Sequence, residues 1–213
     1  MKISIKGAIV SNNDAWIYDW FDEDYTSPKT VHDAIASAEE GEALEVDINS
    51  GGGSVFAGSE IYAALRAYKG PVNIHVVGLA ASAASVIACA GHSDIAPTAQ
   101  MMVHNVSAWS AGDYHEMDKT SDMLKQANRS IAAAYVAKTG MSEADALELM
   151  DKETWLTADD AVAYGLIDSI AGQQNTEPLD LVASINGTLP PSVIAKMQAR
   201  RQALLDYFSE EVD

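Results

Sequence analysis

Residues 43–68, ALEVDINSGGGSVFAGSEIYAALRAY, decide the fold of this chain. Apolar and polar residues alternate through residues 43–49, which is the pattern of a short β-strand. Residues 50–53 follow as a turn, because three consecutive glycines let the backbone bend sharply. The residues after the turn predict a helix with one apolar face, made of Ala57, Ile61, Ala64, Leu65 and Tyr68. A strand that leads through a turn into a helix is the repeating unit of parallel α/β proteins.

Comparable units flank this stretch on both sides. Ser27 and Pro28 supply an N-cap and a proline at the first position of a helix that Gly41 ends. Residues 11–26 are polar, acidic and aromatic, and they predict a loop. Further strands are expected at 3–10, 72–77, 100–105 and 167–170, and further helices at 82–90, 114–138, 142–150 and 157–165. We therefore expect an α/β fold with a largely parallel sheet.

The composition divides the chain after Gly172. Residues 1–172 hold the alternating strands and helices and are expected to form one domain. Residues 173–178 resemble a linker, and Pro190-Pro191 precedes a charged helix with an apolar stripe. We therefore predict that residues 173–213 are a linker plus a C-terminal helical tail.

The composition also excludes several classes of function. Of the 213 residues, 48% are hydrophobic, which is ordinary for a globular protein. There are 31 acids against 13 bases, and the net charge of −18 disfavours nucleic acid and anionic lipid as partners. The single cysteine, Cys89, excludes an internal disulfide framework, and no cluster of residues has metal-ligand spacing. We expect no metal, no cofactor, no nucleic acid and no membrane partner.

No segment predicts export or a membrane span. Residues 1–10 contain two lysines and lack an apolar core followed by a cleavage site. Residues 76–90 are the longest uncharged apolar run, but a glycine and two serines interrupt it, so it is too short and too polar to cross a bilayer. The expected location is the cytoplasm.

Two turns follow predicted strands at the edge where sites collect in open parallel sheets. The glycines of residues 50–53 expose backbone N–H groups to an anion; the alternatives are a phosphate loop, whose lysine is missing, and a plain tight turn. Residues 78–85, GLAASAAS, lead from a strand directly into a helix of small residues. Ser82 at this helix start is either a nucleophile beside helical N–H groups or only an N-cap. Ser85 lies one turn inside the helix and is the weaker candidate.

A serine nucleophile needs a base and an acid that orients the base. His104 ends an apolar strand shortly after the serine helix, and is either that base or a buried core histidine. His75 lies in the middle of a strand, and the other histidines fall on surfaces where solvated roles are usual: His32, His92 and His115. The residues alone leave the acid open among Asp151, Glu153, Asp159, Asp160 and Asp168.

Four motifs, in this order, resemble the Clp-type serine proteases, the ClpP family. They are Asn49-Ser50-Gly51-Gly52-Gly53, Gly78-x-Ala80-Ala81-Ser82, Met102-Val103-His104 and Leu156-Thr157-Ala158-x-x-Ala161-x-x-Tyr164-Gly165-Leu166-Ile167-Asp168. The resemblance covers residues 3–171. It implies a ClpP/crotonase-like superhelix of repeated β-β-α units with a long protruding handle helix over residues 114–138. It also implies a homo-oligomer built of rings.

The resemblance implies a serine endopeptidase and a role for each matching residue. Ser82 would be the nucleophile, and His104 would be the general base. The backbone N–H groups of Gly53 and Ala83 would form the oxyanion hole.

Two positions depart from the family pattern. The family's acid is an aspartate three positions before the Leu-Thr-Ala segment, where this chain has Glu153. A glutamate can orient an imidazole as an aspartate does, and Asp151 is the fallback. The family also commonly has proline after Asn-Ser, where this chain has Gly51.

Within the family, the chain looks most like the head maturation proteases of phages and prophages, which process capsid or scaffold protein in the bacterial cytoplasm. The expectation rests on the short segment before the first strand and on the extended tail, and it disfavours an ATPase partner. One alternative is a housekeeping Clp proteolytic subunit that works with an ATPase. The others are a crotonase-like acyl-CoA enzyme and a non-catalytic assembly protein that keeps the ring.

Overall fold

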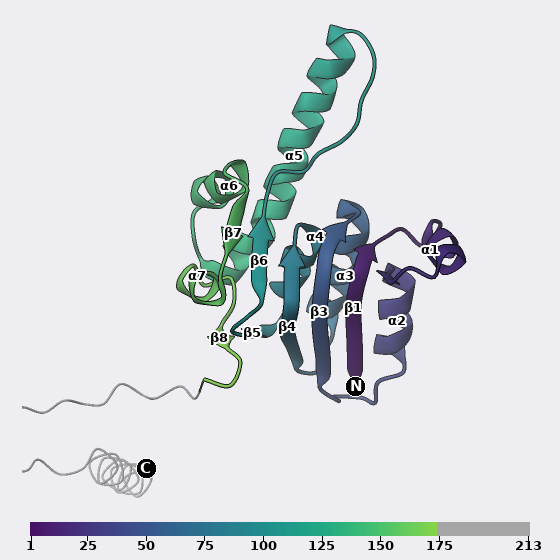
Figure 1. Cartoon of the computed structure of the whole chain (residues 1–213), viewed down its shortest axis with the longest axis vertical. Helices are drawn as coiled ribbons and strands as arrows, with labels where there is room; N and C mark the ends of the chain where they lie inside the picture. The colour runs from purple at the N-terminus through teal and green to yellow at the C-terminus, as the bar shows by residue number, and fades with distance from the viewer. Residues whose placement is uncertain (174–213) are drawn as a thin grey trace, which may run out of the picture. The chain divides into compact units, whose positions relative to one another are not determined.

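A computed structural model describes residues 1–173, which form one unit (Figure 1). Its strands are β1 (Lys2–Ile9), β2 (Tyr25–Thr26), β3 (Leu44–Gly53), β4 (Val72–Ala81), β5 (His92–Ile95), β6 (Gln100–Val103), β7 (Thr154–Leu156) and β8 (Ser169–Ile170). Its helices are α1 (Ala15–Phe21), α2 (Pro28–Ala36), α3 (Val55–Ala67), α4 (Ala83–Ala88), α5 (Tyr114–Thr139), α6 (Glu143–Asp151) and α7 (Ala158–Ala163). The tail predicted for residues 173–213 lies, apart from Gln173, outside the described residues.

The sheet is parallel along its main path, in the strand order β2-β1-β3-β4-β5-β8. Strand β6 pairs in parallel with the carboxyl-terminal part of β4, and β7 pairs antiparallel with β6. The predicted α/β fold with a largely parallel sheet is confirmed.

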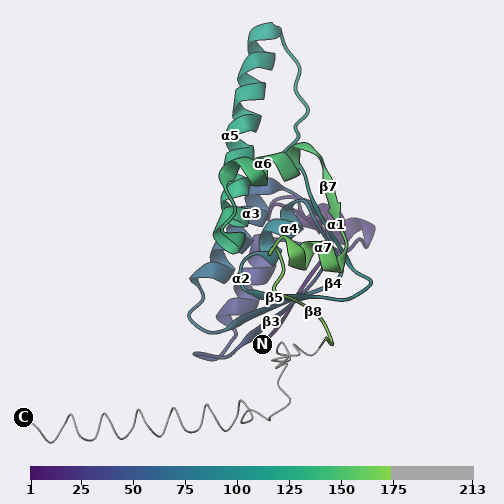
Figure 2. The ribbon, with the colours of Figure 1, turned by 90° about the vertical axis from the view of Figure 1, so that its left-hand side faces the viewer.

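The core lies between this sheet and the helices α2, α3 and α4, which gather on one of its faces (Figures 1 and 2). Alternate residues of the central strands point into it, and Ile5, Ile48 and Val76 are fully buried there. Helix α3 contributes the fully buried Ile61. Removal of these side chains from water is the main term that stabilises the arrangement.

Local signals set several helix boundaries as expected. Ser27 caps α2 in a reciprocal capping box with Thr30, and a second box joins Thr157 to Asp160 at the start of α7. Each box satisfies backbone N–H groups that a helix start leaves without intrahelical acceptors. Helix α2 ends at Ala36, however, earlier than the expected stop at Gly41.

The loop predicted for residues 11–26 was wrong, since this segment contains helix α1 and strand β2. Helix α1 buries none of its residues, so it has no apolar stripe facing the core from which a helix could be predicted. The predicted glycine turn was also misplaced. Residues 50–53 belong to the end of β3, where Gly53 pairs with Ile9 of β1.

Smaller differences concern the later elements. Strands β5 and β7 are additional to the prediction, and both are short enough to lack a clear alternation. The predicted strand 100–105 ends at Val103, and the predicted helix 82–90 is limited to Ala83–Ala88. His92, expected on a helix or loop surface, begins strand β5.

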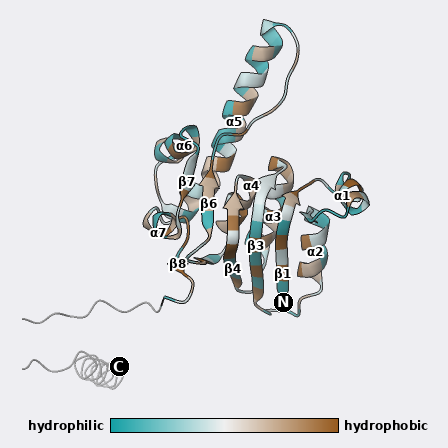
Figure 3. Ribbon diagram, viewed as in Figure 1, coloured by the Kyte–Doolittle hydropathy of each residue, from teal (hydrophilic) through white to brown (hydrophobic). Residues whose placement is uncertain are grey.

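The long helix predicted for residues 114–138 is confirmed as α5, which extends past the carboxyl ends of the strands (Figure 1). Its N-terminal half is exposed and carries mostly hydrophilic residues (Figure 3). Its buried residues are confined to the C-terminal half and are Ile131, Ala132, Ala134 and Tyr135. The helix is therefore anchored at one end and free at the other, as a protruding handle requires.

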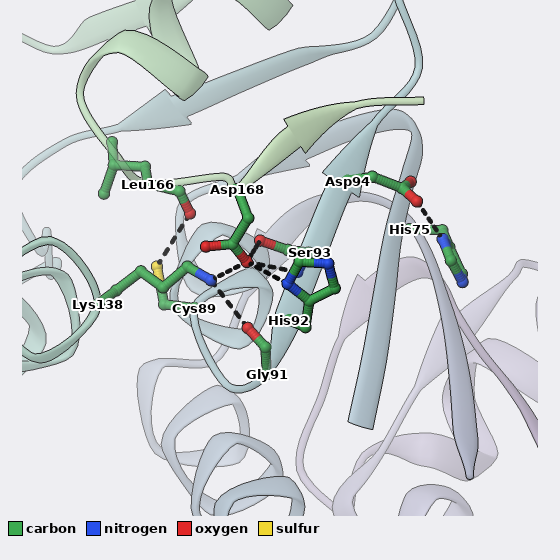
Figure 4. A network of polar contacts seen from close by, with 9 residues as sticks. All are labelled: His75, Cys89, Gly91, His92, Ser93, Asp94, Lys138, Leu166 and Asp168. Atoms are coloured by element: carbon green, nitrogen blue, oxygen red, sulfur yellow. Dashed lines mark hydrogen bonds and ion pairs between the residues drawn. The ribbon is translucent and has the colours of Figure 1, made fainter. Parts of the chain in front are cut away.

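An ion pair anchors the C-terminal end of α5 (Figure 4). The Lys138 ammonium, nearly buried, donates to the Asp168 carboxylate at 2.5 Å and to the Gly91 carbonyl at 2.9 Å. The same carboxylate accepts from the Ser93 backbone N–H at 2.7 Å. Burial raises the pKa of Asp168, but the bonds from Lys138 and Ser93 outweigh it and hold the pKa below its usual value.

No helix of residues 1–173 is long and apolar enough to cross a membrane. In the same part of the chain, no group of three or more His, Cys, Asp or Glu side chains is arranged to hold a metal ion. Cys89 is buried and its thiol is free. Burial raises the pKa of this thiol to about 12, which keeps it protonated and unreactive.

Candidate active site

Ser82 occupies a strained turn between β4 and α4. Its backbone lies at φ 55° and ψ −124°, a conformation that residues other than glycine rarely adopt. The Ser82 N–H donates to the Met102 carbonyl at 3.0 Å, and this bond holds the turn against strand β6. Strain of this kind persists only where the surrounding structure enforces it, and it is common at nucleophiles on strand-to-helix turns.

His104 directly follows β6 and faces Ser82. Its Nε2 atom lies 2.8 Å from the Ser82 Oγ atom, within hydrogen-bonding distance. The contact follows from the topology, because the parallel register of β4 and β6 pairs Ala81 with Met102. The two strands therefore end side by side, and the residues that follow them meet. The structure thus brings together the expected nucleophile and the expected base.

The glycines at the end of β3 are required by close contacts, Gly52 with this turn and Gly53 with β1. Gly52 has φ +91°, and a Cβ atom there would lie 2.7 Å from the Cβ of Ser82. Gly53 has φ +149°, and a Cβ atom there would lie 2.2 Å from the Ile9 carbonyl oxygen. Only glycine fits either position, so backbone rather than side chain approaches Ser82 from this side.

The N–H of Ala83 is a backbone donor next to Ser82. Ala83 is the first residue of α4, and the first N–H groups of a helix have no intrahelical acceptor. The expected oxyanion residues, Gly53 and Ala83, line the same cavity as Ser82 and His104.

This catalytic cavity has a volume of about 70 Å³. The rest of its lining is mostly apolar and comprises Val55, Val86, Val106, Ser107, Ile131 and Tyr135. No acidic side chain contributes to it. A small apolar cavity next to a hydroxyl and an imidazole suits a short apolar side chain of a bound substrate.

The structure does not show an acid bonded to His104. In residues 1–173, no carboxylate makes a hydrogen bond with His104. The β6–β7 ladder ends with the pair Val103 and Thr154, so His104 and Glu153 are the residues that come directly after this last pair on the two strands. Glu153 is exposed and has φ 48°. Asp151 instead accepts a bond from the Asn105 side-chain amide at 2.8 Å.

The other acids near this region have separate partners. Asp160 forms the capping box of α7 with the N-cap residue Thr157, and the hydrogen bonds from Thr157 lower the pKa of the Asp160 carboxyl. Asp159 lies in the first turn of the same helix. Asp168 is engaged by Lys138 at the base of α5. None of the three is expected to orient His104.

The remaining histidines also lie away from Ser82. His75 points from β4 toward Asp94 of β5, as Figure 4 shows, with its Nδ1 atom 2.9 Å from that carboxylate. Its Nε2 atom lies 2.9 Å from a carboxylate oxygen of Glu45. His32 pairs with Glu60, and His92 with Asp168. These three imidazoles therefore pair with carboxylates of the sheet and the surface and not with Ser82.

Sequence reasoning missed a buried contact beneath Ser82. Ser85, considered above only as a weaker nucleophile, donates its Oγ–H to the Ser82 carbonyl at 2.6 Å. Its oxygen also lies 2.8 Å from the hydroxyl of Tyr135 on α5. Fifty residues separate Ser85 from Tyr135, so no local pattern could have joined them.

Comparison with known proteins identifies the family. The profile described as Clp protease matches residues 29–174. An "ATP-dependent Clp protease proteolytic subunit" of Pleurastrum terricola is 30% identical over 145 residues, which cover 66% of this chain and 73% of that protein. An "ATP-dependent Clp protease proteolytic subunit 1" of Chlamydia abortus is 33% identical over 135 residues, which cover 61% and 70%.

A solved structure agrees with these matches at the level of the fold. A ClpP1 mutant from Listeria monocytogenes superposes with a TM-score of 0.65 at 20% sequence identity, covering 81% of this chain and 92% of that one. Together with the family match over most of the described residues, these findings lead to one conclusion: the chain belongs to the Clp protease family of serine-type peptide hydrolases.

Proposed function

We propose that this chain hydrolyses peptide bonds with Ser82 as the nucleophile and His104 as the general base. The observation that carries the proposal is the 2.8 Å contact between His104 Nε2 and Ser82 Oγ at a strained strand-to-helix turn. A serine hydroxyl is a weak nucleophile until an adjacent base accepts its proton. The contact has the geometry that this transfer needs.

The reaction proceeds in two halves. His104 takes the proton of the Ser82 hydroxyl as Oγ bonds to the substrate carbonyl carbon, and then gives it to the leaving amine as the C–N bond breaks. Water, activated by the same imidazole, then hydrolyses the acyl-enzyme and restores the Ser82 hydroxyl.

The developing oxyanion accepts hydrogen bonds from the N–H groups of Gly53 and Ala83. Loss of one such donor lowers the rate by about 10²- to 10³-fold in comparable enzymes. Both residues line the catalytic cavity. Because Gly52 and Gly53 are closely packed and have no side chains, the side of the cavity formed by β3 is backbone alone.

Glu153 is proposed as the acid that orients His104. Glu153 and His104 each adjoin the last pair of the β6–β7 ladder, Val103 and Thr154, and the exposed side chain of Glu153 is free to change rotamer toward the imidazole. Asp151 remains the fallback, but its bond to Asn105 occupies it.

The cavity argues against an acyl-CoA hydratase or isomerase on a related fold. Those enzymes use carboxylates as acid and base, whereas the cavity lining contains none. The contact between Ser82 and His104 likewise favours a working peptidase over an inactive assembly protein.

The biological setting is a finer proposal. A phage or prophage head maturation role, with capsid or scaffold protein as substrate, stays a prediction. The relatives named above are ATP-dependent proteolytic subunits, and a housekeeping subunit with an ATPase partner fits at least as well. A homo-oligomeric ring is proposed for either role. Co-expression with an AAA+ Clp ATPase or with capsid protein separates the two, according to which one makes degradation or site-limited cleavage appear.

The test of peptidase activity is cleavage of an unfolded protein such as reduced, carboxymethylated casein. Ser82→Ala should abolish cleavage while the circular dichroism spectrum and oligomeric state stay unchanged. Ser107→Ala, in the same cavity, is the matched control and should retain most of the rate. Cleavage that survives in folded Ser82→Ala would refute the assignment.

A further inference from the structure

A second, larger cavity opens beside the catalytic one, at the carboxyl end of β1. Its volume is about 590 Å³. Helix α1 forms one wall through Ile17, Tyr18 and Phe21, and the end of β1 with Gly53 and Ser54 forms the other. Figure 1 shows α1 at the end of the sheet from which α5 rises. We call this space the α1 cavity.

The α1 cavity and the catalytic cavity share a wall. Gly53, one of the two proposed oxyanion donors, lines both. Ser82 follows β4 and the α1 cavity follows β1, with only β3 between these strands. Neighbouring strands lie about 4.8 Å apart, so the two places are separated by roughly 10 Å, or about three residues of extended peptide. A chain held at Ser82 can therefore place a nearby side chain in the α1 cavity.

Helix α1 presents an unusual apolar surface there. It buries none of its residues, although four of its seven are large and hydrophobic. The exposed fractions are 64% for Trp16, 37% for Ile17, 79% for Trp20 and 69% for Phe21. Of these four side chains, Ile17 and Phe21 line the α1 cavity. Exposed apolar groups at a cavity are typical of binding surfaces rather than of a solvated helix.

The charge around the α1 cavity has one sign. Asp14 and Glu23 line it, and residues 11–28 contain five acids and no lysine or arginine. Within residues 1–173, none of these five carboxylates forms an ion pair. A second copy of this chain would bring its own net charge of −18 to the surface. A basic ligand is electrostatically the better match.

From these observations we propose that the α1 cavity is an extended substrate site. It binds an apolar side chain with an adjacent lysine or arginine, about three residues from the scissile bond. Ile17 and Phe21 contact the apolar side chain, and Asp14 and Glu23 attract the basic one. The inference rests on the proposed peptidase function, since the occupant is the polypeptide held at Ser82.

The experiment measures binding without cleavage. Full-length Ser82→Ala protein is titrated by fluorescence anisotropy with two short labelled peptides that differ at one pair of positions, Leu-Lys in one and Ser-Glu in the other. The Leu-Lys peptide should bind about tenfold more tightly or better, because burial of one leucine side chain alone is sufficient for that factor. The preference should disappear in Phe21→Ser and persist in Tyr164→Ser. Tyr164 is an exposed aromatic residue at the C-cap of helix α7 and serves as the control.

Two results would overturn the inference. One is equal binding of the two peptides, and the other is a preference that survives in Phe21→Ser. If the oligomeric state of Phe21→Ser changes as well in the second case, the surface is a contact between copies. Failure of the proposed function itself is seen separately, as absence of casein cleavage by the chain that carries Ser82. In an active chain, cleavage sites mapped by mass spectrometry should show the apolar and basic pair about three residues from the cut bond.

Discussion

The hydroxyl of Tyr135 lies 2.8 Å from the Oγ atom of Ser85, in the interior of the domain. Ser85 donates its only hydroxyl hydrogen to the Ser82 carbonyl, so Tyr135 is the donor in the second bond. Burial raises the pKa of the Tyr135 hydroxyl, which keeps it protonated as a donor. The anchored end of α5 is thereby connected through Ser85 to the backbone of Ser82, the proposed nucleophile.

This connection predicts an asymmetry in stability. Tyr135→Phe removes one neutral hydrogen bond and should lower the free energy of unfolding by about 1 kcal/mol. Ser85→Ala leaves the buried Tyr135 hydroxyl without its acceptor and should cost more, about 1–3 kcal/mol. Urea unfolding of the two variants and of the double variant measures the difference. A double variant less stable than the sum of the single effects would contradict the pairing.

The acid is tested by two matched substitutions. Glu153→Gln should lower kcat by about 10²- to 10⁴-fold, because a neutral amide cannot stabilise the imidazolium that forms at His104. Asp151→Asn should change kcat little, since the Asp151 carboxylate accepts from Asn105. The opposite ranking would assign the role of the acid to Asp151.

The glycines before α3 offer a test with an internal control. In Gly52→Ala the new Cβ would lie 2.7 Å from the Cβ of Ser82, at a φ of +91°. The nucleophile should shift, and a displacement near 1 Å lowers kcat/KM by about a hundredfold. A Cβ at Gly51 meets nothing within 4 Å, so Gly51→Ala should keep its activity. Similar kcat/KM values for both variants would argue against close packing at Ser82.

His75 predicts a dependence of stability on pH. Burial lowers its pKa, but the bonds to Glu45 and Asp94 outweigh burial and raise the pKa above its usual value of about 6.5. The folded protein therefore holds this proton more tightly than the unfolded chain. The stabilisation is complete below about pH 6.5 and is lost as the pH rises through the folded pKa.

The measurement is the difference in unfolding free energy between the wild type and His75→Gln across this pH range. The wild-type advantage should shrink as the pH increases. An advantage that is constant, or that grows with pH, would show that the two carboxylates do not hold a proton on His75.

Much of the fold follows from local patterns, and the failures have local causes. The capping residues Ser27 and Thr157 and the long helix from Tyr114 were predictable, because caps and apolar periodicity act within a few residues. Helix α1 was not, because the side chains of Trp16 and Trp20 face outward and leave no core-facing stripe. The end of β3 at Gly53 depends on pairing with β1, which no local pattern encodes.

The site divides in the same way. Ser82 and His104 each follow a recognisable strand, and parallel pairing brings the two together. The residues alone left the acid ambiguous because Glu153 and Asp151 are only two residues apart, and the bond between Asn105 and Asp151 that separates them is a tertiary contact. Tyr135 was missed because its partner is brought to it by tertiary packing of α5 alone.

The most direct test of the central claim is labelling of the folded protein with a fluorophosphonate probe, followed by mass mapping of the adduct. This probe reacts with a serine whose hydroxyl is activated by a neighbouring base. The account predicts one adduct, on Ser82, that is lost in His104→Ala and retained in His75→Gln. An adduct on another serine, labelling of Ser82 that persists in His104→Ala, or a folded wild type that never reacts would contradict it.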